Sequence, residues 1–105
     1  MLAIRWFDQF GAPGLQARAG GCSQALSPVV QITTDPRWGR LEENFGEDPH
    51  LVAMLGVASL TGIQGRGSVG PDANASTYIA DPVHHPFAEV KHFAGYGAFP
   101  KVRSR

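Results

Sequence analysis

The chain has 105 residues, and nine Lys and Arg residues balance nine Asp and Glu residues to a formal net charge of zero at pH 7. A chain without excess positive charge offers no basic surface to nucleic acid and no polybasic patch to a membrane, so we predict neither partner. Hydrophobic residues at 43% and charged residues at 17% are the proportions of a packed globular domain. The single cysteine, Cys22, excludes an internal disulfide, and we expect its thiol to be a small core side chain.

The N-terminal stretch contains Arg5 and Asp8 and lacks a continuous apolar run, so it does not have the pattern of a secretory signal. No apolar run elsewhere approaches the roughly 20 residues needed to cross a bilayer. Residues 1–14 show no clear hydrophobic period and end in a cluster of helix breakers, Gly11-Ala12-Pro13-Gly14, so we treat them as a separate lead-in. Residues 15–19 are expected to be the tail of a helix that Gly20-Gly21 stop.

Two short strands and a helix are predicted from the rest of the chain. The β-branched run PVVQITT predicts a mostly buried strand over residues 28–34. Asp48 as a cap and Pro49 at the first helical position predict a helix over residues 49–64, stopped by Gly65. We expect the buried face of this helix to comprise Leu51, Leu55, Ala58 and Gly62.

A second strand is predicted over residues 88–94, which completes a strand–helix–strand unit with parallel strands and places the chain in the α/β class. Residues 65–86 are much longer than a usual connection in such a unit, so we expect a surface excursion. This excursion contains the glycosylation sequence Asn74-Ala75-Ser76, which matters only in a secreted protein. Residues 98–105 form a tail without a readable pattern.

The loop Asp35-Pro36-Arg37-Trp38-Gly39-Arg40 is the first candidate for chemistry, because it brings two guanidinium groups and an indole to the end of a strand. Forked donors and a flat apolar ring suit a ligand rich in hydroxyl groups, such as a sugar. The alternative is an Arg–carboxylate network that ties down the loop, with Glu42, Glu43 and Glu47 as partners.

The pair Lys91-His92 is the second candidate, since two adjacent polar side chains in an apolar stretch need either buried partners or a cleft. If the sheet is a barrel, both candidates open on the same rim at the carboxyl ends of the strands. The alternative is a lone salt bridge from Lys91 and a hydrogen-bonded core His92. We expect the glycines of Gly95-Tyr96-Gly97 to relieve steric crowding in a tight turn.

A metal site is not predicted. His84 and His85 could be combined with His50 or His92, but no spacing typical of metal ligands occurs. No nucleophile elbow, Walker sequence or dinucleotide fingerprint is present either, so the sequence indicates no cofactor.

The run LSPVVQITTDPRWGRLEENFGEDPHLVAMLGVASLTGIQG and the later VKHFAGYG resemble the N-terminal catalytic domain of glycoside hydrolase family 3, of the beta-glucosidase and beta-xylosidase type. The resemblance covers about residues 16–97 and includes DPRWGR, FGEDP and KHFAGYG in the family's order. It implies a (β/α)8 TIM-type barrel and exo-acting, retaining hydrolysis of β-linked glucosides or xylosides in carbohydrate metabolism. It also implies that Arg40, Lys91 and His92 bind hydroxyls of the sugar that loses its bond. Asp35, Arg37 and Trp38 match the motif, and we assign them to the architecture of the loop rather than to catalysis.

The chain departs from the family in what it lacks. The nucleophilic Asp of a Ser-Asp-Trp type segment, the carboxylate that acts as acid and base, and a sugar-binding Asp expected before this stretch are all missing, so we assign no catalytic residue. A complete barrel takes about 250 residues, so the resemblance predicts a fragment with about two or three of the eight units. We place this partial barrel domain at residues 15–97.

Three hypotheses follow from this resemblance and from the missing carboxylates. In the first, the chain is the sugar-binding wall of a β-glycosidase active site. In the second, it is a truncated, catalytically inactive chain or a carbohydrate-binding remnant. In the third, it is a small independent α/β enzyme with a metal-dependent site of its own. Relatives of this kind are often secreted or periplasmic, whereas the sequence itself indicates neither a compartment nor an oligomeric state.

Overall fold

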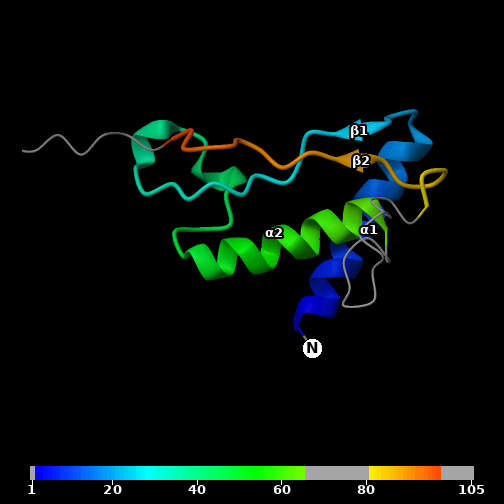
Figure 1. Cartoon of the computed structure of the whole chain (residues 1–105), viewed down its shortest axis with the longest axis horizontal. Coiled ribbons are helices and arrows are strands. Elements are labelled where there is room, and N and C mark those ends of the chain that lie inside the picture. Colours follow the sequence, from blue (N-terminus) through cyan, green and yellow to red (C-terminus); the bar gives the residue numbers. More distant parts are fainter. Residues whose placement is uncertain (1, 66–80, 98–105) are drawn as a thin grey trace, which may run out of the picture.

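A computed structural model of the chain describes residues 2–65 and 81–97, with side chains from residue 11 onward (Figure 1). Two helices, two short strands and two 3-10 turns follow one another as α1 (Leu2–Ala19), β1 (Gln24–Ala25), η1 (Pro36–Trp38), η2 (Leu41–Glu43), α2 (Pro49–Gln64) and β2 (Phe87–Ala88). The glycosylation sequence at 74–76, the tail and most of the long connection lie outside the described residues. No helix in the described part is long and apolar enough to span a membrane.

The two strands pair in parallel, as the strand–helix–strand prediction requires. Gln24 lies opposite Phe87 and Ala25 opposite Ala88, and an isolated parallel bridge further along joins Val29 to Lys91. Figure 1 shows the two segments running side by side above α2, so the helix covers one face of the paired segments. Helices beside a two-stranded parallel sheet agree in part with the predicted α/β class.

The regular strands are shorter than the predicted residues 28–34 and 88–94, and the first begins earlier. Between β1 and the bridge the register changes, because the first segment advances four residues from Ala25 to Val29 while the second advances three from Ala88 to Lys91. Beyond the bridge, the amide of His92 donates to the side-chain Oε1 of Gln31 rather than to a backbone carbonyl, at 3.2 Å. Regular pairing stops at the isolated bridge, so the prediction of a continuous strand over 28–34 is wrong.

Helix α2 has the predicted bounds of 49–64. The Asp48 carboxylate accepts a hydrogen bond from the amide of His50 at 2.9 Å, which caps the helix, and Pro49 occupies the first turn. At the other end, Gly65 adopts a φ of +85° and its amide donates to the carbonyl of Gly62. These local signals set the helix limits independently of what the helix packs against.

The buried face of α2 is rotated from the predicted face and shares Gly62 with it. The other buried residues of the helix are Val52, Gly56, Ser59, Ile63 and Gln64. Leu51, by contrast, is 44% exposed and Met54 is 53% exposed. The close approach of the strand segment explains this rotation, because a Cβ atom at Gly56 would lie 2.9 Å from Cγ1 of Val30. A face that presents a glycine lets Val30 approach the helix closely, whereas Leu51 and Leu55 would hold it away.

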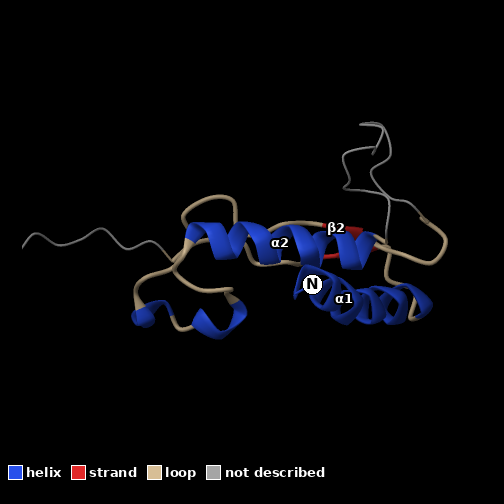
Figure 2. Ribbon diagram, turned by 90° about the horizontal axis from the view of Figure 1, so that it is seen from below, coloured by secondary structure: helices blue, strands red, loops and turns tan. Residues whose placement is uncertain are grey.

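Helix α1 runs without interruption through residues 11–14, so the predicted break between a lead-in and the following helix is wrong. Figure 2 shows α1 beside α2, with the sheet behind α2. A Cβ atom at Gly14 would lie 2.6 Å from the carbonyl oxygen of Ile63, and one at Gly11 would lie 3.8 Å from that of Gly62. Glycine at position 14 therefore allows the backbones of the two helices to come close together, and tertiary contact outweighs weak helix propensity.

The predicted end of α1 is confirmed, whereas the predicted place of the cysteine is not. The helix ends at Ala19, and Gly21 takes up a φ of +91°. The amide of Cys22 then donates to the carbonyl of Ala17 at 2.9 Å. This turn carries the Cys22 side chain to the surface, so Cys22 is exposed and not part of the core.

Candidate functional site

The structure brings Arg40 close to Lys91 and His92, although about 50 residues of sequence separate the two candidates. The Trp38 ring links them, because its centroid lies 5.6 Å from Cζ of Arg40 and 6.1 Å from the centroid of the His92 ring. Lys91 is held beside Val29 by two backbone hydrogen bonds, from its own amide to Pro28 at 2.9 Å and from the amide of Val30 to its carbonyl at 2.8 Å. The pairing that begins at β1 and β2 thus delivers both candidates to one end of the molecule.

The loop before Arg40 is held by an ion pair between Asp35 and Arg37. The Asp35 carboxylate accepts hydrogen bonds from the Arg37 amide at 2.9 Å and from its Nε at 2.9 and 3.0 Å, and it also pairs with Nη2. These hydrogen bonds lower the pKa of Asp35 to about 2. Gly39 ends the turn with a φ of +83°, a conformation that glycine adopts without strain. The Asp35–Arg37 pair therefore serves the architecture of the loop.

Arg40 is oriented by Glu43. Its Nε and Nη2 donate to Oε1 and Oε2 of that carboxylate, both at 2.6 Å, in a two-point contact that fixes the plane of the guanidinium. This contact raises the pKa of Arg40 and lowers the pKa of Glu43, which Lys91 and His92 lower further. The Arg–carboxylate network considered as an alternative thus exists, with Glu43 as the partner of Arg40, and it also presents Arg40 to the cluster.

His92 is half-buried and bound to a residue that the sequence analysis did not single out. Its Nδ1 lies 2.8 Å from Oε1 of Gln31, whose backbone carbonyl in turn accepts a hydrogen bond from Asn44 at 2.7 Å. Desolvation, followed by the nearby cations of Arg40 and Lys91, lowers the pKa of His92. In the sequence, the one feature that distinguishes Gln31 is that it is the single amide side chain in the β-branched run PVVQITT.

Tyr96 completes an aromatic cluster over the site. Its ring lies 4.6 Å from the His92 ring and 5.4 Å from the Trp38 ring between centroids, and it is 5.9 Å from Cζ of Arg40. Tyr96 is 51% exposed, so one part of this cluster faces solvent. A Cβ atom at Gly97 would lie 2.8 Å from Cδ2 of Trp38, which confirms steric relief at Gly97, whereas a Cβ atom at Gly95 would have no neighbour within 4 Å and the prediction is wrong there. In the sequence, Tyr96 stands out only as the aromatic residue between the two glycines of Gly95-Tyr96-Gly97.

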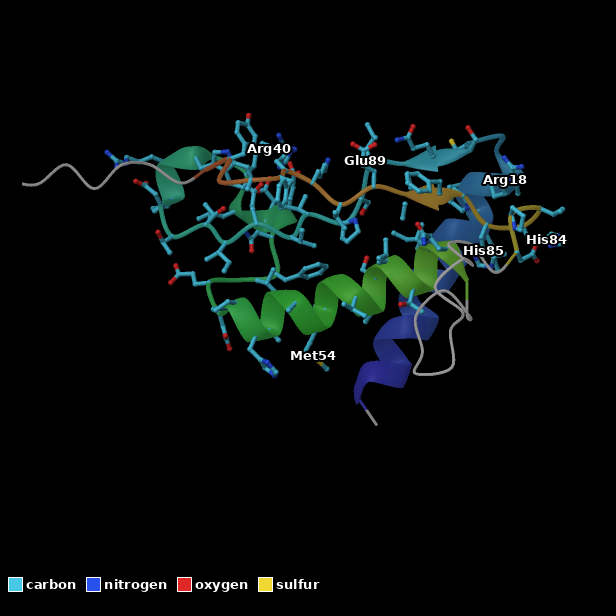
Figure 3. All side chains as sticks on the ribbon, in the orientation of Figure 1. Arg18, Arg40, Met54, His84, His85 and Glu89 are labelled. Atoms are coloured by element: carbon cyan, nitrogen blue, oxygen red, sulfur yellow. The ribbon has the colours of Figure 1, made fainter. Side chains whose placement is uncertain are left out.

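The other histidines do not join this cluster. In Figure 3, His84 and His85 lie near Arg18, at the opposite end of the molecule from Arg40. Nδ1 of His84 contacts Asp81 at 2.6 Å, and Nδ1 of His85 contacts the carbonyl of Ile63 at 2.9 Å. Within residues 2–65 and 81–97, no three His, Cys, Asp or Glu side chains are grouped so as to hold a metal ion.

A separate groove is entirely apolar in its lining and has a volume of about 280 Å³. It lies between α2 and the paired segments, and its lining residues are Val30, Ile32, Pro49, Val52, Ala53, Gly56, Val57, Leu60 and Val90. Without a polar group to orient a ligand, this groove suits a packing surface rather than a sugar site.

Comparison with known proteins places both candidate segments in one family. A family model described as "Glycosyl hydrolase family 3 N terminal domain" matches residues 11–101. A beta-xylosidase of Formosa agariphila is 42% identical over 82 residues, which are 77% of this chain and 10% of that protein. A periplasmic beta-glucosidase of Salmonella typhimurium is 35% identical over 83 residues, 79% of this chain and 9% of the relative.

Solved structures agree with the sequence relatives. A beta-glucosidase from Listeria innocua matches with a TM-score of 0.70 and 36% identity, covering 89% of this chain and 12% of that one. A beta-glucosidase from Erythrobacter marinus matches with a TM-score of 0.68 and 39% identity, covering 89% and 11%. The fold and these matches define a glycoside hydrolase segment of the α/β class. The chain belongs to glycoside hydrolase family 3, as the resemblance predicted, and it spans about a tenth of the length of these relatives.

Proposed function

We propose that this chain forms the sugar-binding wall of a retaining β-glycosidase, in which Arg40, Lys91 and His92 hold the hydroxyls of a β-linked glucoside or xyloside. The observation that carries the proposal is the convergence of Arg40 and His92 beside the rings of Trp38 and Tyr96, with the charge of Lys91 near enough to act on Glu43 and His92. A guanidinium, an ammonium and an imidazole supply directional hydrogen bonds, and an aromatic ring supplies an apolar face for a sugar.

The carboxylates beside the cluster are not prepared for the chemical step. Retaining hydrolysis needs a nucleophile and a proton donor, with their carboxyl groups about 5 to 5.5 Å apart, and the donor needs a raised pKa. Asp35 and Glu43 both have lowered pKa values, because Arg37 donates hydrogen bonds to Asp35 and Arg40 donates them to Glu43. The proposal therefore gives this chain a binding role and assigns the reacting carboxylates to residues other than these.

We further propose that the chain is a part of a (β/α)8 barrel. A parallel strand pair covered by one helix is the repeating unit of such a barrel, and neighbouring units cover both edges of each unit. The apolar groove beside α2 supports this proposal, because the exposed side chains of Ile32 and Val57 there would gain a partner from an adjacent unit. The exposed Met54 on α2 is further apolar surface available to a neighbouring helix (Figure 3).

Titration with isofagomine, a hydroxylated cyclic amine seen bound in a structure of the Listeria innocua beta-glucosidase, tests the binding role directly. We expect the amide and side-chain NMR signals of Arg40, His92 and Tyr96 to shift on titration of the full chain. An Arg40→Met variant should lose these shifts. Arg18→Met is the matched control, because it removes the same charge at the opposite end of the molecule (Figure 3). Equal loss in both variants, or no shift at the cluster in the parent chain, would contradict the proposal.

The inactive-remnant hypothesis is favoured for the isolated chain by the same lowered pKa values. It predicts that isofagomine binds while aryl β-glucosides and β-xylosides release no p-nitrophenol. Turnover by the purified chain alone would show that a proton donor and a nucleophile are present, and would remove this alternative.

A further inference from the structure

Gln31 makes an unusual set of contacts for a buried amide. It is 7% exposed, and its Oε1 lies 3.2 Å from the backbone nitrogen of His92 and 2.8 Å from Nδ1 of the same residue. Its Nε2 lies 3.4 Å from Oγ1 of the buried Thr33. One oxygen thus contacts His92 twice, which ties the imidazole to the side chain of a residue 61 positions away.

The contact with the backbone of His92 determines which nitrogen of the imidazole must carry a hydrogen. A backbone N–H can only donate, so the amide atom facing it must be the oxygen of Gln31 and not its nitrogen. That oxygen can only accept, so Nδ1 of His92 must carry a hydrogen. The nearby cations of Arg40 and Lys91 disfavour a positive charge on the imidazole. Among the charged neighbours, only Glu43 favours one. A neutral ring with hydrogen on Nδ1 leaves the lone pair on Nε2.

We propose that Gln31 is a positioning residue that holds His92 as the neutral Nδ1–H tautomer, so that Nε2 presents a hydrogen-bond acceptor to the sugar. This inference rests on the proposed function, and it changes the role of one member of the wall. Arg40 and Lys91 can only donate, whereas His92 accepts. A hydroxyl group can accept from a cation and donate to His92 at the same time, whereas fluorine or a methyl ether in its place cannot donate.

The tautomer can be measured on the full chain without any ligand. Long-range proton–nitrogen correlation NMR distinguishes a ring nitrogen that carries hydrogen from one that carries a lone pair. At neutral pH we expect His92 to show hydrogen on Nδ1 and a lone pair on Nε2. Hydrogen on Nε2 alone, or on both nitrogens, overturns the inference.

Two variants test whether Gln31 is the cause. Gln31→Glu keeps the shape and the acceptor but adds a negative charge, so it should raise the pKa of His92 by about 1 to 3. Gln31→Met removes the acceptor at similar volume, and hydrogen on Nε2 should then become detectable. Gln16→Glu, on the exposed surface of α1, is the control and should leave His92 unchanged. If the Gln31→Met variant fails to fold, the Gln31→Glu variant and the spectrum of the parent chain still test the inference. A folded Gln31→Glu variant with an unchanged pKa of His92 overturns the inference.

Isofagomine separates this inference from the function on which it rests. If the expected tautomer is present and isofagomine leaves the cluster unperturbed, the assignment of Gln31 is supported and the proposed sugar-binding role is wrong. If isofagomine binds while Nε2 carries the hydrogen, the sugar-binding role is supported and the assignment of Gln31 is wrong.

Discussion

Replacing Gly14 with alanine adds one methyl group where α1 crosses α2. The new Cβ would lie 2.6 Å from the carbonyl oxygen of Ile63, 3.0 Å from its Cα and 3.2 Å from its carbonyl carbon. All three atoms belong to the backbone, so a change of rotamer cannot relieve the contact and the helices must separate. Overpacking of this kind costs about 1–3 kcal/mol, against which the better helix propensity of alanine offsets up to about 1 kcal/mol. We therefore expect a net loss of roughly 1–2 kcal/mol.

Gly11→Ala is the matched control in the same helix. Its Cβ would lie 3.8 Å from the nearest backbone atom, an ordinary contact distance, so helix propensity should dominate and stabilise the chain by about 0.5–1 kcal/mol. Urea unfolding followed by circular dichroism should move the two midpoints in opposite directions at equal slope. In a thermal melt, each 1 kcal/mol corresponds to roughly 4–8 °C for a domain of this size. A Gly14→Ala variant as stable as Gly11→Ala would refute the close helix crossing.

Two further predictions concern charge. Asp35→Asn should destabilise the chain at neutral pH, because the ionised carboxylate holds Arg37. Since the pKa of Asp35 is lowered from 3.8 to about 2, that contribution is complete above pH 3.8 and is lost as the pH falls toward 2. Paired thermal melts should therefore show the two proteins converging in acid, and a constant difference would contradict the ion pair. Separately, NMR titration of His92 should show its pKa rise in Arg40→Met and fall in Glu43→Gln, since one substitution removes a neighbouring cation and the other an anion. Shifts of the same sign in both variants would contradict the arrangement of these charges.

The limits of α2 were predictable from local chemistry, whereas its buried face was not. Asp48, Pro49 and Gly65 act within one turn of the helix ends, so their effect can be read without knowing the fold. Apolar residues surround this helix on nearly all sides, as the exposed Leu51 and Met54 show, so periodicity does not single out one face.

The continuous helix α1 was missed because one of its helix breakers, Gly14, has a tertiary role. Gly11 and Gly14 both weaken an isolated helix, yet in the fold Gly14 allows the close approach of α2. A single sequence shows the local cost of a glycine and not the contact that offsets it. The same limit applies to Gln31, which reads as one polar residue in a strand until His92 is placed beside it.

The proximity of the candidate site residues followed from topology. Parallel strands end at the same edge, so the loop with Arg40 and the segment with Lys91 were expected to meet, and they do. The choice of Glu43 among three nearby glutamates was not predictable, because it depends on the η2 turn that places the carboxylate against Arg40.

The apolar groove beside α2 governs how the isolated chain behaves at different concentrations. Full burial of an exposed aliphatic side chain such as that of Ile32 or Val57 is worth up to about 1.5–3 kcal/mol, so a polypeptide surface that fills the groove is drawn to it. Tenfold dilution weakens such an encounter between two molecules by about 1.4 kcal/mol. Yield, dispersity and shelf life of the purified chain will therefore depend on keeping it dilute, or on supplying a mild detergent that occupies the groove.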